Sequence, residues 1–317
     1  SDWEGTFPTH DGKVSDQIST WGNEINGTDD NGNPVSYLYY KTVSDDLLAK
    51  LDSTDSLSPV DAITFKDKIV FGKDNGLTLI DLRGLDYEDP LWDELLDQLT
   101  PEDYQIMIAQ AGYGTEALES IDKPFAIDAD TASGLIYGGT GMMFQNSMVL
   151  AQTWNRDLAI EFGEMIGNEA VLGGANGWYA PSMNIHRTPF SGRNGEYYSE
   201  DAFLSGNVGS AATYGAAEKG VYTFIKHFAL NDQENHRGDR EGQYCIATWS
   251  NEQAIREIYL KPFEMSLKVG NVKLNYVEKN AQGVYENKSR EIPAGQAVMT
   301  AFNRIGYTWT GGSYPLI

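Results

Sequence analysis

The sequence has little of what several classes of protein require. Its 317 residues include one cysteine, Cys245, and only 23 lysines and arginines against 46 aspartates and glutamates. A single cysteine forms no disulfide within the chain and excludes cysteine-rich metal motifs, so we interpret the thiol as structural. The formal net charge of −23 argues against nucleic acid and anionic membrane as partners, since both are bound through basic patches.

Long apolar segments are also missing. No run of 18 or more apolar residues occurs, so we expect no membrane-spanning helix, and no charged and then apolar segment marks a secretion signal. The chain begins at Ser1 and stops at Ile317 within a repeating pattern, so we expect a fragment of a longer protein. Its 41% of hydrophobic residues fits a bacterial-type soluble enzyme, of cytoplasmic or of extracellular or cell-surface location.

The first part of the chain is polar and rich in turns. Gly, Asn, Asp and Pro occur there at a density that marks loops and short strands rather than long helices. Residues 37–40 and 62–72 have the pattern of edge strands. We interpret residues 1–76 as an irregular, β-rich linker or as the remnant of a preceding domain.

From residue 86 onward, short apolar runs alternate with helical patterns. The expected strands are Lys123–Ile127, Trp178–Met183, Val221–Ile225 and Ala297–Phe302. The expected helices are 91–99, 101–111, 151–174, 199–219 and 250–270, the last with a capping box of Ser250 and Gln253. The polar residues 271–295 are expected to form a surface insertion.

The alternation of strands and helices predicts an α/β fold with parallel strands. Polar residues after each strand favour a (β/α)8 TIM-type barrel, whose site lies at the carboxyl ends of its strands. Four strands make half of such a barrel, so we interpret residues 77–317 as the first, incomplete part of a barrel domain. An open half-barrel exposes strand edges, and we expect it to associate or to be completed by another segment. A doubly wound sheet of fewer strands is the structural alternative.

The chain is organised around the stretch GVYTFIKHFALNDQEN, residues 220–235. A run of strand-forming residues there delivers Lys226 and His227, and a polar cluster follows at once. Polar groups at the end of a core strand are costly to bury unpaired, so they face a ligand or satisfy one another. This stretch therefore predicts either a site or a hydrogen-bonded patch at a strand end.

Three further blocks decide between these interpretations. They are SGRNGEYYSED (191–201), REIYLKPFEMSL (256–267) and AVMTAFNRIG (297–306). In this order, the four blocks resemble the first barrel domain of family-3 glycoside hydrolases of the β-glucosidase group, from about Leu77 to Ile317. In permuted members of that family a sandwich domain precedes the barrel, and residues 1–76 resemble the segment that joins them. The resemblance implies hydrolysis of terminal β-D-glucosyl or related β-glycosyl residues with retention, on a β-glucoside or oligosaccharide, without cofactor or metal.

The resemblance also implies roles for individual residues. Asp130, in DADTASG where the family often has DGPAG, is the expected acceptor for ring hydroxyls, with a helix cap as its alternative role. Arg193 is expected beside the sugar, and Lys226 and His227 as paired hydroxyl donors. Met299 is expected to line the pocket or, alternatively, the core. Glu196, Glu234 and Arg237 are expected to support the loops around the sugar. Glu196 would pair with its neighbours, and Glu234 would form an ion pair with Arg237.

The chain departs from the family pattern in several places. Ile136 stands near the position where the family often has an arginine. The nucleophilic aspartate is expected beyond Ile317 and the acid/base glutamate in the other domain, so both catalytic residues are unknown here. Ser1-Asp2-Trp3 matches the nucleophile motif, but no strand precedes it, and we interpret Asp2 as a decoy. ALNDQE replaces the histidine-bearing sequence of the acetylglucosaminidase branch, which favours glucoside-type substrates.

Two other functions were weighed. A non-catalytic sugar-binding or interaction module would use the same residues without chemistry. A metallohydrolase based on His186, His227 and His236 is disfavoured, because these histidines lack the i, i+4 helical spacing of common zinc sites.

Overall fold

The computed structural model describes residues 70–136, 141–234, 237, 246–248, 250, 252–306 and 308–317. Nearly all of the predicted linker, with the expected edge strand at 37–40, lies outside these residues, as do Asp2, His236 and Cys245. Within the described ranges, no helix is both long enough and apolar enough to cross a bilayer.

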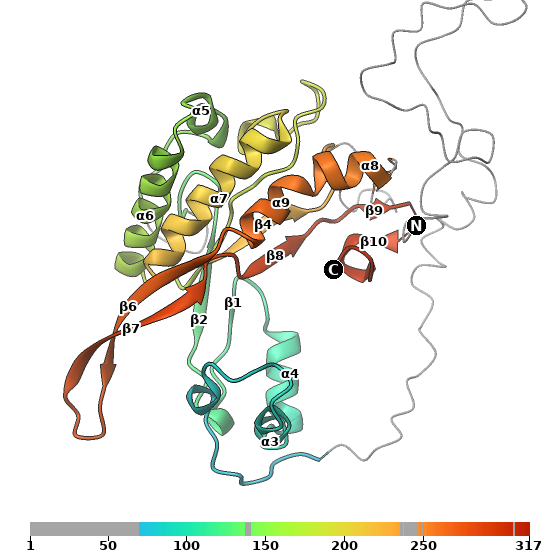
Figure 1. Cartoon of the computed structure of the whole chain (residues 1–317). Coiled ribbons are helices and arrows are strands. Elements are labelled where there is room, and N and C mark those ends of the chain that lie inside the picture. The colour runs from blue at the N-terminus through green and yellow to red at the C-terminus, as the bar shows by residue number, and fades with distance from the viewer. Residues whose placement is uncertain are drawn as a thin grey trace, which may run out of the picture.

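A five-stranded sheet in the order β1-β2-β3-β4-β8 is the centre of the described chain (Figure 1). β1 (Gly114–Thr115) pairs antiparallel with β2 (Ala126–Asp130). β2, β3 (Gly177–Tyr179), β4 (Tyr222–Phe228) and β8 (Ala297–Thr300) then run parallel. The four predicted strands are therefore present and adjacent, and they form the expected half-barrel.

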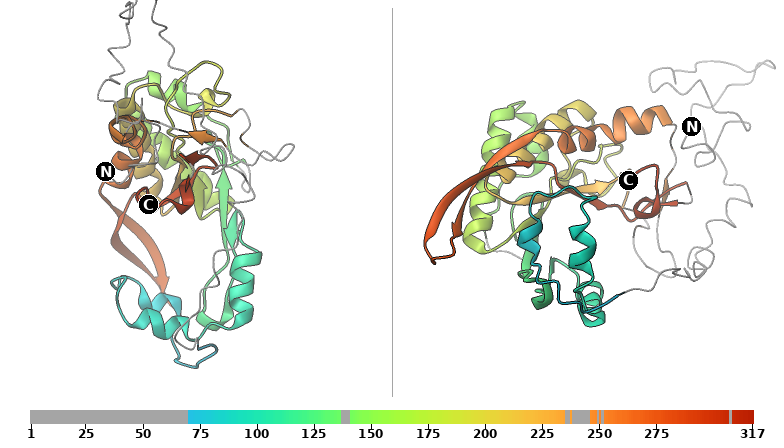
Figure 2. Two further views of the ribbon diagram at one scale, coloured as in Figure 1. Left: turned by 90° about the vertical axis from the view of Figure 1, so that its right-hand side faces the viewer. Right: turned by 60° about the horizontal axis from the view of Figure 1, so that its bottom comes forward.

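Helices pack on one face of this sheet (Figure 2). They are α5 (Ser147–Gln152), α6 (Arg156–Gly173), α7 (Ala202–Glu218) and α9 (Lys261–Leu267). Ala129, Trp178 and Ile225, on three successive parallel strands, are buried with residues of these helices in a single hydrophobic core. A doubly wound sheet would carry helices on both faces, so the one-sided packing favours the barrel over that alternative.

The predicted helix at 151–174 is two helices. Trp154 has a φ of 54°, a left-handed conformation that no helix continues through, and α5 ends just before it. The side chain of Asn155 then caps α6 by accepting a hydrogen bond from the Leu158 N–H at 3.1 Å. α6 ends where predicted, because Gly174 with a φ of 80° supplies the left-handed residue that commonly follows a helix.

The predicted helix at 250–270 is shorter and interrupted. α8 (Glu252–Ala254) passes into a π-helical turn at Ile255–Tyr259, and α9 ends at Leu267. Of the apolar residues expected on its core face, Ile255, Tyr259 and Phe263 are buried, whereas Ile258 is half-buried and Leu267 is exposed. The hydrophobic pattern therefore located most of the buried face, but it did not reveal the change in helix type.

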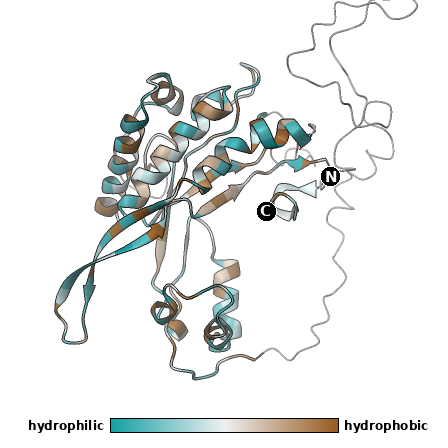
Figure 3. Cartoon of the chain, viewed as in Figure 1, coloured by the Kyte–Doolittle hydropathy of each residue, from teal (hydrophilic) through white to brown (hydrophobic). Residues whose placement is uncertain are grey.

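The predicted surface insertion is a two-stranded hairpin, β6 (Asn271–Lys279) and β7 (Tyr285–Pro293). Only its base joins a core, where Val272 and Ala294 pack with Ala217 of α7. The hairpin projects beyond the sheet and helices (Figures 1 and 2), and its outer part is largely hydrophilic (Figure 3).

A second, smaller core lies among α3 (Leu91–Leu96), α4 (Pro101–Ala109) and the 3-10 turn Leu79–Leu82. α4 begins as predicted. The Thr100 Oγ1 accepts from the Asp103 N–H at 3.1 Å, and the Asp103 carboxylate accepts from the Thr100 N–H at 2.8 Å. A three-stranded sheet near the C-terminus completes the description: β5 (Ala247–Thr248), β9 (Arg304–Ile305) and β10 (Thr308–Trp309).

Candidate functional site

The carboxyl ends of the parallel strands bring together most of the predicted polar residues. Asp130 is the last residue of β2, Lys226 and His227 lie near the end of β4, and the segment after β3 leads to Arg193 and Glu196. Because parallel strands end at the same edge of a sheet, Asp130 and Lys226 are neighbours although 96 positions separate them.

The ammonium group of Lys226 lies between two carboxylates. Its Nζ is 2.5 Å from Asp130 Oδ1 and 3.2 Å from Glu196 Oε1, and its side chain is only 3% exposed. A buried ammonium requires such partners, since an unpaired buried charge is very costly. Asp130 also accepts a hydrogen bond from the Tyr113 hydroxyl at 3.1 Å, so its carboxylate belongs to this cluster rather than to a helix cap.

Glu196 is the most heavily bonded carboxylate of the cluster. It accepts from the Ser182 hydroxyl at 2.8 Å and from both Nε and Nη2 of Arg193, the Nε at 2.7 Å. Burial alone would raise the pKa of Glu196, but Lys226 and Arg193 outweigh it and lower the pKa from 4.5 to about 2. Glu196 therefore stays ionised at any physiological pH and pairs with its neighbours as predicted.

Glu234 links two guanidinium groups. Its carboxylate is 3.1 Å from Arg237 Nη1, which is the predicted ion pair, and 3.6 Å from Arg193 Nη1. The Arg237 guanidinium also lies over the ring of Phe302, 4.6 Å from its centroid. The charged residues from Asp130 to Arg237 thus form one continuous network.

The network leaves hydrogen-bonding capacity unused. Arg193 Nη1, Arg237 Nε and Asn231 Oδ1 are buried without a hydrogen-bond partner among the described residues. Buried polar atoms are nearly always paired in folded proteins, so each of these atoms can take a further hydrogen-bond partner.

His227 is buried and uncharged. Burial first, and then the positive charge of Arg193, lower its pKa well below 6.5. Its Nδ1 lies 3.2 Å from the Tyr197 hydroxyl oxygen. The side-chain amide of Asn184 holds the backbone of His227, accepting from its N–H at 2.8 Å and donating to its carbonyl at 2.9 Å.

Met299 is less closely tied to the cluster. It lies in β8 two residues after Ala297, which pairs with Phe224 of β4, and its side chain is partly buried. Alternation along the strand places Met299 on the same sheet face as Ala297. Its role in lining a pocket stays a prediction. Ile136, at the position of the family's arginine, is 48% exposed.

Sequence analysis gave no role to Ser182, Asn184 or Tyr197, although each bonds directly to a predicted site residue. Ser182 and Asn184 follow β3, and Tyr197 stands within the block 191–201. Their position was the only available signal, because serine, asparagine and tyrosine occur throughout ordinary protein surfaces and cores.

Among the described residues, no group of three or more His, Cys, Asp or Glu is arranged to hold a metal ion. His186 Nε2 lies 3.1 Å from the carbonyl oxygen of Tyr197. Of the three histidines weighed for a metal site, His186 and His227 are thus both engaged with Tyr197, and His236 lies outside the described part of the chain.

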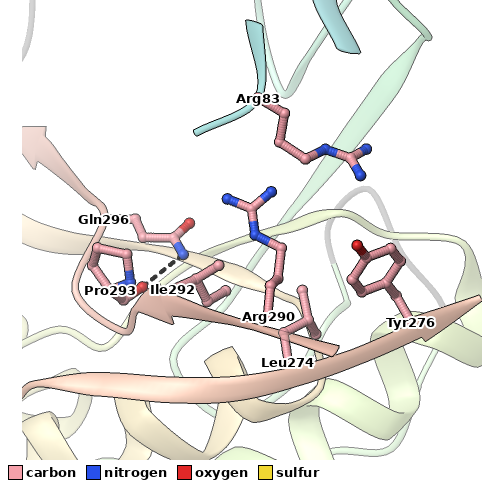
Figure 4. A pocket seen from close by; sticks show the side chains of 7 residues that line it. All are labelled: Arg83, Leu274, Tyr276, Arg290, Ile292, Pro293 and Gln296. Atoms are coloured by element: carbon pink, nitrogen blue, oxygen red, sulfur yellow. Dashed lines mark hydrogen bonds between the residues drawn. The ribbon is translucent and has the colours of Figure 1, made fainter. Parts of the chain in front are cut away.

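A pocket of about 470 Å³ lies elsewhere, at the hairpin. Figure 4 shows Arg83 and Arg290 entering the pocket from opposite sides, and the Arg83 guanidinium lies over the Tyr276 ring, 5.7 Å from its centroid. The pocket includes Gln296, next to the amino end of β8, whereas the charged network lies at the carboxyl ends of the strands. The two places share no residue.

A parallel half-barrel with carboxylates, cations and a histidine at its strand ends defines an α/β protein with an incomplete barrel and a polar cluster where barrel sites lie. The family described as Glycosyl hydrolase family 3 N terminal domain matches residues 101–277, more than half of the chain. The chain therefore belongs to glycosyl hydrolase family 3, which confirms the resemblance found in the sequence.

Individual relatives agree with this assignment. β-Glucosidase A of Butyrivibrio fibrisolvens is 40% identical over 161 residues, which is 50% of this chain and 18% of that protein. The β-glucosidase of Ruminococcus albus is 32% identical over 241 residues, 71% of this chain and 22% of that protein. The structure of β-glucosidase 3B from Thermotoga neapolitana in complex with glucose superposes with a TM-score of 0.54 and 31% identity, covering 69% of this chain and 30% of that one. The chain thus spans about a fifth of the length of these curated relatives.

Proposed function

We propose that this chain supplies the sugar-binding part of an enzyme that hydrolyses terminal β-D-glucosyl, or related β-glycosyl, residues with retention. The observation that carries the proposal is the network around Lys226, which gathers hydrogen-bond acceptors and donors at one sheet edge and leaves Arg193 Nη1 without a hydrogen bond to the described residues. A hydroxyl-rich ring requires both kinds of group. The glucose bound to the Thermotoga neapolitana relative supports the same ligand class.

Each predicted residue has a role in this proposal. The Asp130 carboxylate accepts hydrogen bonds from ring hydroxyls, and Lys226, His227 and Arg193 donate to hydroxyl oxygens. Met299 contributes an apolar contact. Glu196, Glu234 and Arg237 hold the donors in place. Glu196 and Glu234 pair with Arg193, and Arg237 pairs with Glu234.

The two catalytic carboxyl groups come from other parts of the protein in this proposal. Retention requires a nucleophile and an acid/base about 5–5.5 Å apart, and no metal or cofactor takes part. Asp130 and Glu196 are both bonded to Lys226, so they are acceptors rather than free nucleophiles. We assign the nucleophilic aspartate to the remaining barrel segment and the acid/base glutamate to the sandwich domain.

The first test is hydrolysis of a nitrophenyl β-glucoside by the complete enzyme carrying Lys226→Ala. Loss of a charged donor and release of two carboxylates should lower kcat/KM by about 100-fold to 1,000-fold, or about 3–4 kcal/mol of transition-state stabilisation. Lys273→Ala, on the exposed outer face of the hairpin, is the matched control and should leave the rate unchanged. Equal rates for Lys226→Ala and the parent enzyme would overturn the proposal.

The second test uses the 317-residue chain itself, incubated with the same glucoside and titrated with glucose by NMR. We expect binding that Lys226→Ala abolishes, and no hydrolysis. Hydrolysis by the chain would assign the nucleophile to a carboxylate within it, including Asp2. Binding without hydrolysis in the completed enzyme as well would instead support the non-catalytic sugar-binding module.

A further inference from the structure

Three buried side chains form a hydrogen-bonded row behind the candidate site. The Asn231 side-chain amide donates to the Tyr197 hydroxyl oxygen at 3.2 Å, and that hydroxyl lies 3.2 Å from His227 Nδ1. All three residues are almost fully buried, with exposed fractions of 1% for Tyr197, 2% for Asn231 and 3% for His227. Water therefore does not compete for these bonds, and their donors and acceptors can be assigned from chemistry.

The orientation of the Asn231 amide is fixed by a carboxylate. Asn231 Nδ2 also lies 3.2 Å from Glu234 Oε1, and an ionised carboxylate only accepts. The nitrogen, and not the oxygen, of the amide must therefore face both Glu234 and Tyr197. Because the Tyr197 oxygen accepts from this nitrogen, its own proton is left to donate.

The Tyr197 proton has two acceptors within reach. His227 Nδ1 is at 3.2 Å, and the backbone oxygen of Asn231 is at the longer distance of 3.4 Å. Burial first raises the pKa of Tyr197, so the phenol keeps its proton, while burial lowers the pKa of His227, so the imidazole holds one proton. If Nδ1 accepts, that one proton is on Nε2.

We propose that Tyr197 is a positioning residue, which holds His227 in the tautomer with its proton on Nε2 and so makes it a neutral hydrogen-bond donor toward a sugar hydroxyl. The hydroxyl ligand rests on the proposed function, whereas the tautomer rests on the three buried side chains alone. Nε2 makes no recorded hydrogen bond to the described residues, so its N–H is free for a ligand oxygen. A neutral donor suits this place, because the charges of Lys226, Arg193 and Arg237 are already matched by three carboxylates and a further positive charge would have no partner.

The tautomer is measured directly in the 317-residue chain. Long-range proton–nitrogen NMR spectra of protein labelled with ¹⁵N-histidine distinguish the two tautomers and the charged form, and His227→Gln identifies the signals of His227 among those of the four histidines. At neutral pH we expect unprotonated Nδ1 and protonated Nε2. An Nδ1–H or charged His227 in the native chain would overturn the proposal without any further variant.

The variant Tyr197→Phe removes only the hydroxyl. We expect the Nε2–H signals to give way to a mixture of tautomers, because Nδ1 loses its donor. Tyr198→Phe is the matched control: Tyr198 is equally buried, its hydroxyl makes no recorded hydrogen bond to described residues, and its spectrum should keep the parent pattern. A folded Tyr197→Phe chain with an unchanged His227 spectrum would refute the role of Tyr197.

In the complete enzyme, Tyr197→Phe should lower kcat/KM for a nitrophenyl β-glucoside by about tenfold, as expected for one misdirected hydrogen bond. Tyr198→Phe should have little effect. If the parent enzyme hydrolyses no β-glucoside, the proposed function is wrong. The NMR spectra of His227 still test the tautomer, because they do not depend on activity. An NMR change in Tyr197→Phe with an unchanged rate would refute the link between the tautomer and the reaction.

Discussion

Single residues in this chain show how neighbouring charges give two buried carboxyl groups opposite pKa shifts, although burial raises the pKa of both. Glu196 is surrounded by Lys226 and Arg193, which hold it ionised with a pKa of about 2. Among the described residues, Asp232 accepts a hydrogen bond from the Ile185 N–H at 3.0 Å, and Arg187 supplies the favourable charge. Burial therefore dominates there and raises the pKa of Asp232 to about 7.

Glu196→Gln should destabilise the fold, because Lys226 and Arg193 each lose a buried charged partner and keep only Asp130 and Glu234, respectively. We expect a loss of about 3 kcal/mol in the free energy of unfolding at pH 7, measured with urea. Since the pKa of Glu196 in the fold lies below its ordinary 4.5, its contribution is complete above pH 4.5 and is lost as the pH falls toward about 2. The difference between parent and variant should shrink over that interval.

The matched control is Glu264→Gln on α9, where the carboxylate pairs with Lys261 and Lys268 at the surface. Exposed pairs contribute little, so we expect a change below about 0.5 kcal/mol. Equal losses for Glu196→Gln and Glu264→Gln would contradict the view that burial gives the Lys226 network its strength.

Asp232→Asn should have the reverse effect. The raised pKa means that ionisation of Asp232 costs free energy in the fold; the cost is absent below about pH 3.8, grows up to about pH 7 and is constant above it. Asparagine keeps an oxygen for the Ile185 N–H and carries no charge. Because the side chain is only partly buried, we expect a gain of about 1–3 kcal/mol at pH 8 that vanishes near pH 4. Parallel stability curves for parent and variant across this range would contradict the assignment.

Among the larger elements, α6 and α7 depend on a close approach of their backbones. A Cβ built on Gly163 would lie 2.2 Å from the Ala212 carbonyl oxygen, and one on Gly215 would lie 2.2 Å from the Ile160 carbonyl oxygen. Both oxygens belong to the backbone of the facing helix, so neither can move without moving that helix. The pairing of these helices therefore requires glycine at both positions.

Gly215→Ala should separate the helices and lower the free energy of unfolding by about 2–3 kcal/mol, because overpacking outweighs the higher helix propensity of alanine, worth about 1 kcal/mol. Thermal unfolding measures the loss. Gly112→Ala is the control, since a Cβ there meets no atom within 4 Å. A Gly215→Ala chain as stable as the parent would show that α7 can shift freely.

Which elements the sequence predicted depends on how local their signals are. Capping residues and the glycine after α6 act within one turn, so the start of α4 and the end of α6 were correct. The hairpin was not recognised although Val272, Leu274 and Tyr276 of β6 alternate with polar residues, because β7 is almost entirely polar and offers no matching pattern. The break between α5 and α6 at Trp154 was not recognised either, since tryptophan is not a residue type that indicates a left-handed conformation.

The candidate site shows the same division. The charged residues were identified from the blocks that carry them, and the Glu234–Arg237 pair was predicted because only three positions separate its members. The contact of Lys226 with Glu196 spans 30 positions and exists only once β3 and β4 lie side by side. In our proposal Tyr197 acts through His227. A tyrosine in a sequence does not indicate that it will contact a histidine 30 positions away.

At the scale of the whole molecule, the half-barrel form leaves the described sheet with an open edge at β8. β8 is the last strand of the parallel sheet in the described chain. The Ala301 N–H donates to the Phe228 carbonyl at 2.7 Å, so by alternation along the strand the N–H groups of Val298 and Thr300 point away from β4. At this edge of the described sheet, these two N–H groups are available to pair with another strand.

We expect the purified chain to self-associate as its concentration rises, measured by sedimentation velocity. Thr300→Pro should reduce the association, because proline removes an outward N–H without touching the bonds to β4. Thr300→Val, which keeps that N–H, is the control and should associate like the parent chain. Association unaffected by Thr300→Pro would show that contacts between chains form through another surface.

The hairpin of β6 and β7 is a site where the chain can be engineered. Its two strands start and finish next to each other, since Asn271 pairs with Pro293 and the Ala294 N–H donates to the Gly270 carbonyl at 2.9 Å. We therefore expect that everything beyond the pair Asn275 and Ser289 can be exchanged for a short turn, a fluorescent tag or a foreign peptide, at the cost of the Arg83 contacts with Tyr276 and Glu278 and with the path of the chain into β8 unchanged. The hairpin is a grafting point, remote from the strand ends where the charged network lies.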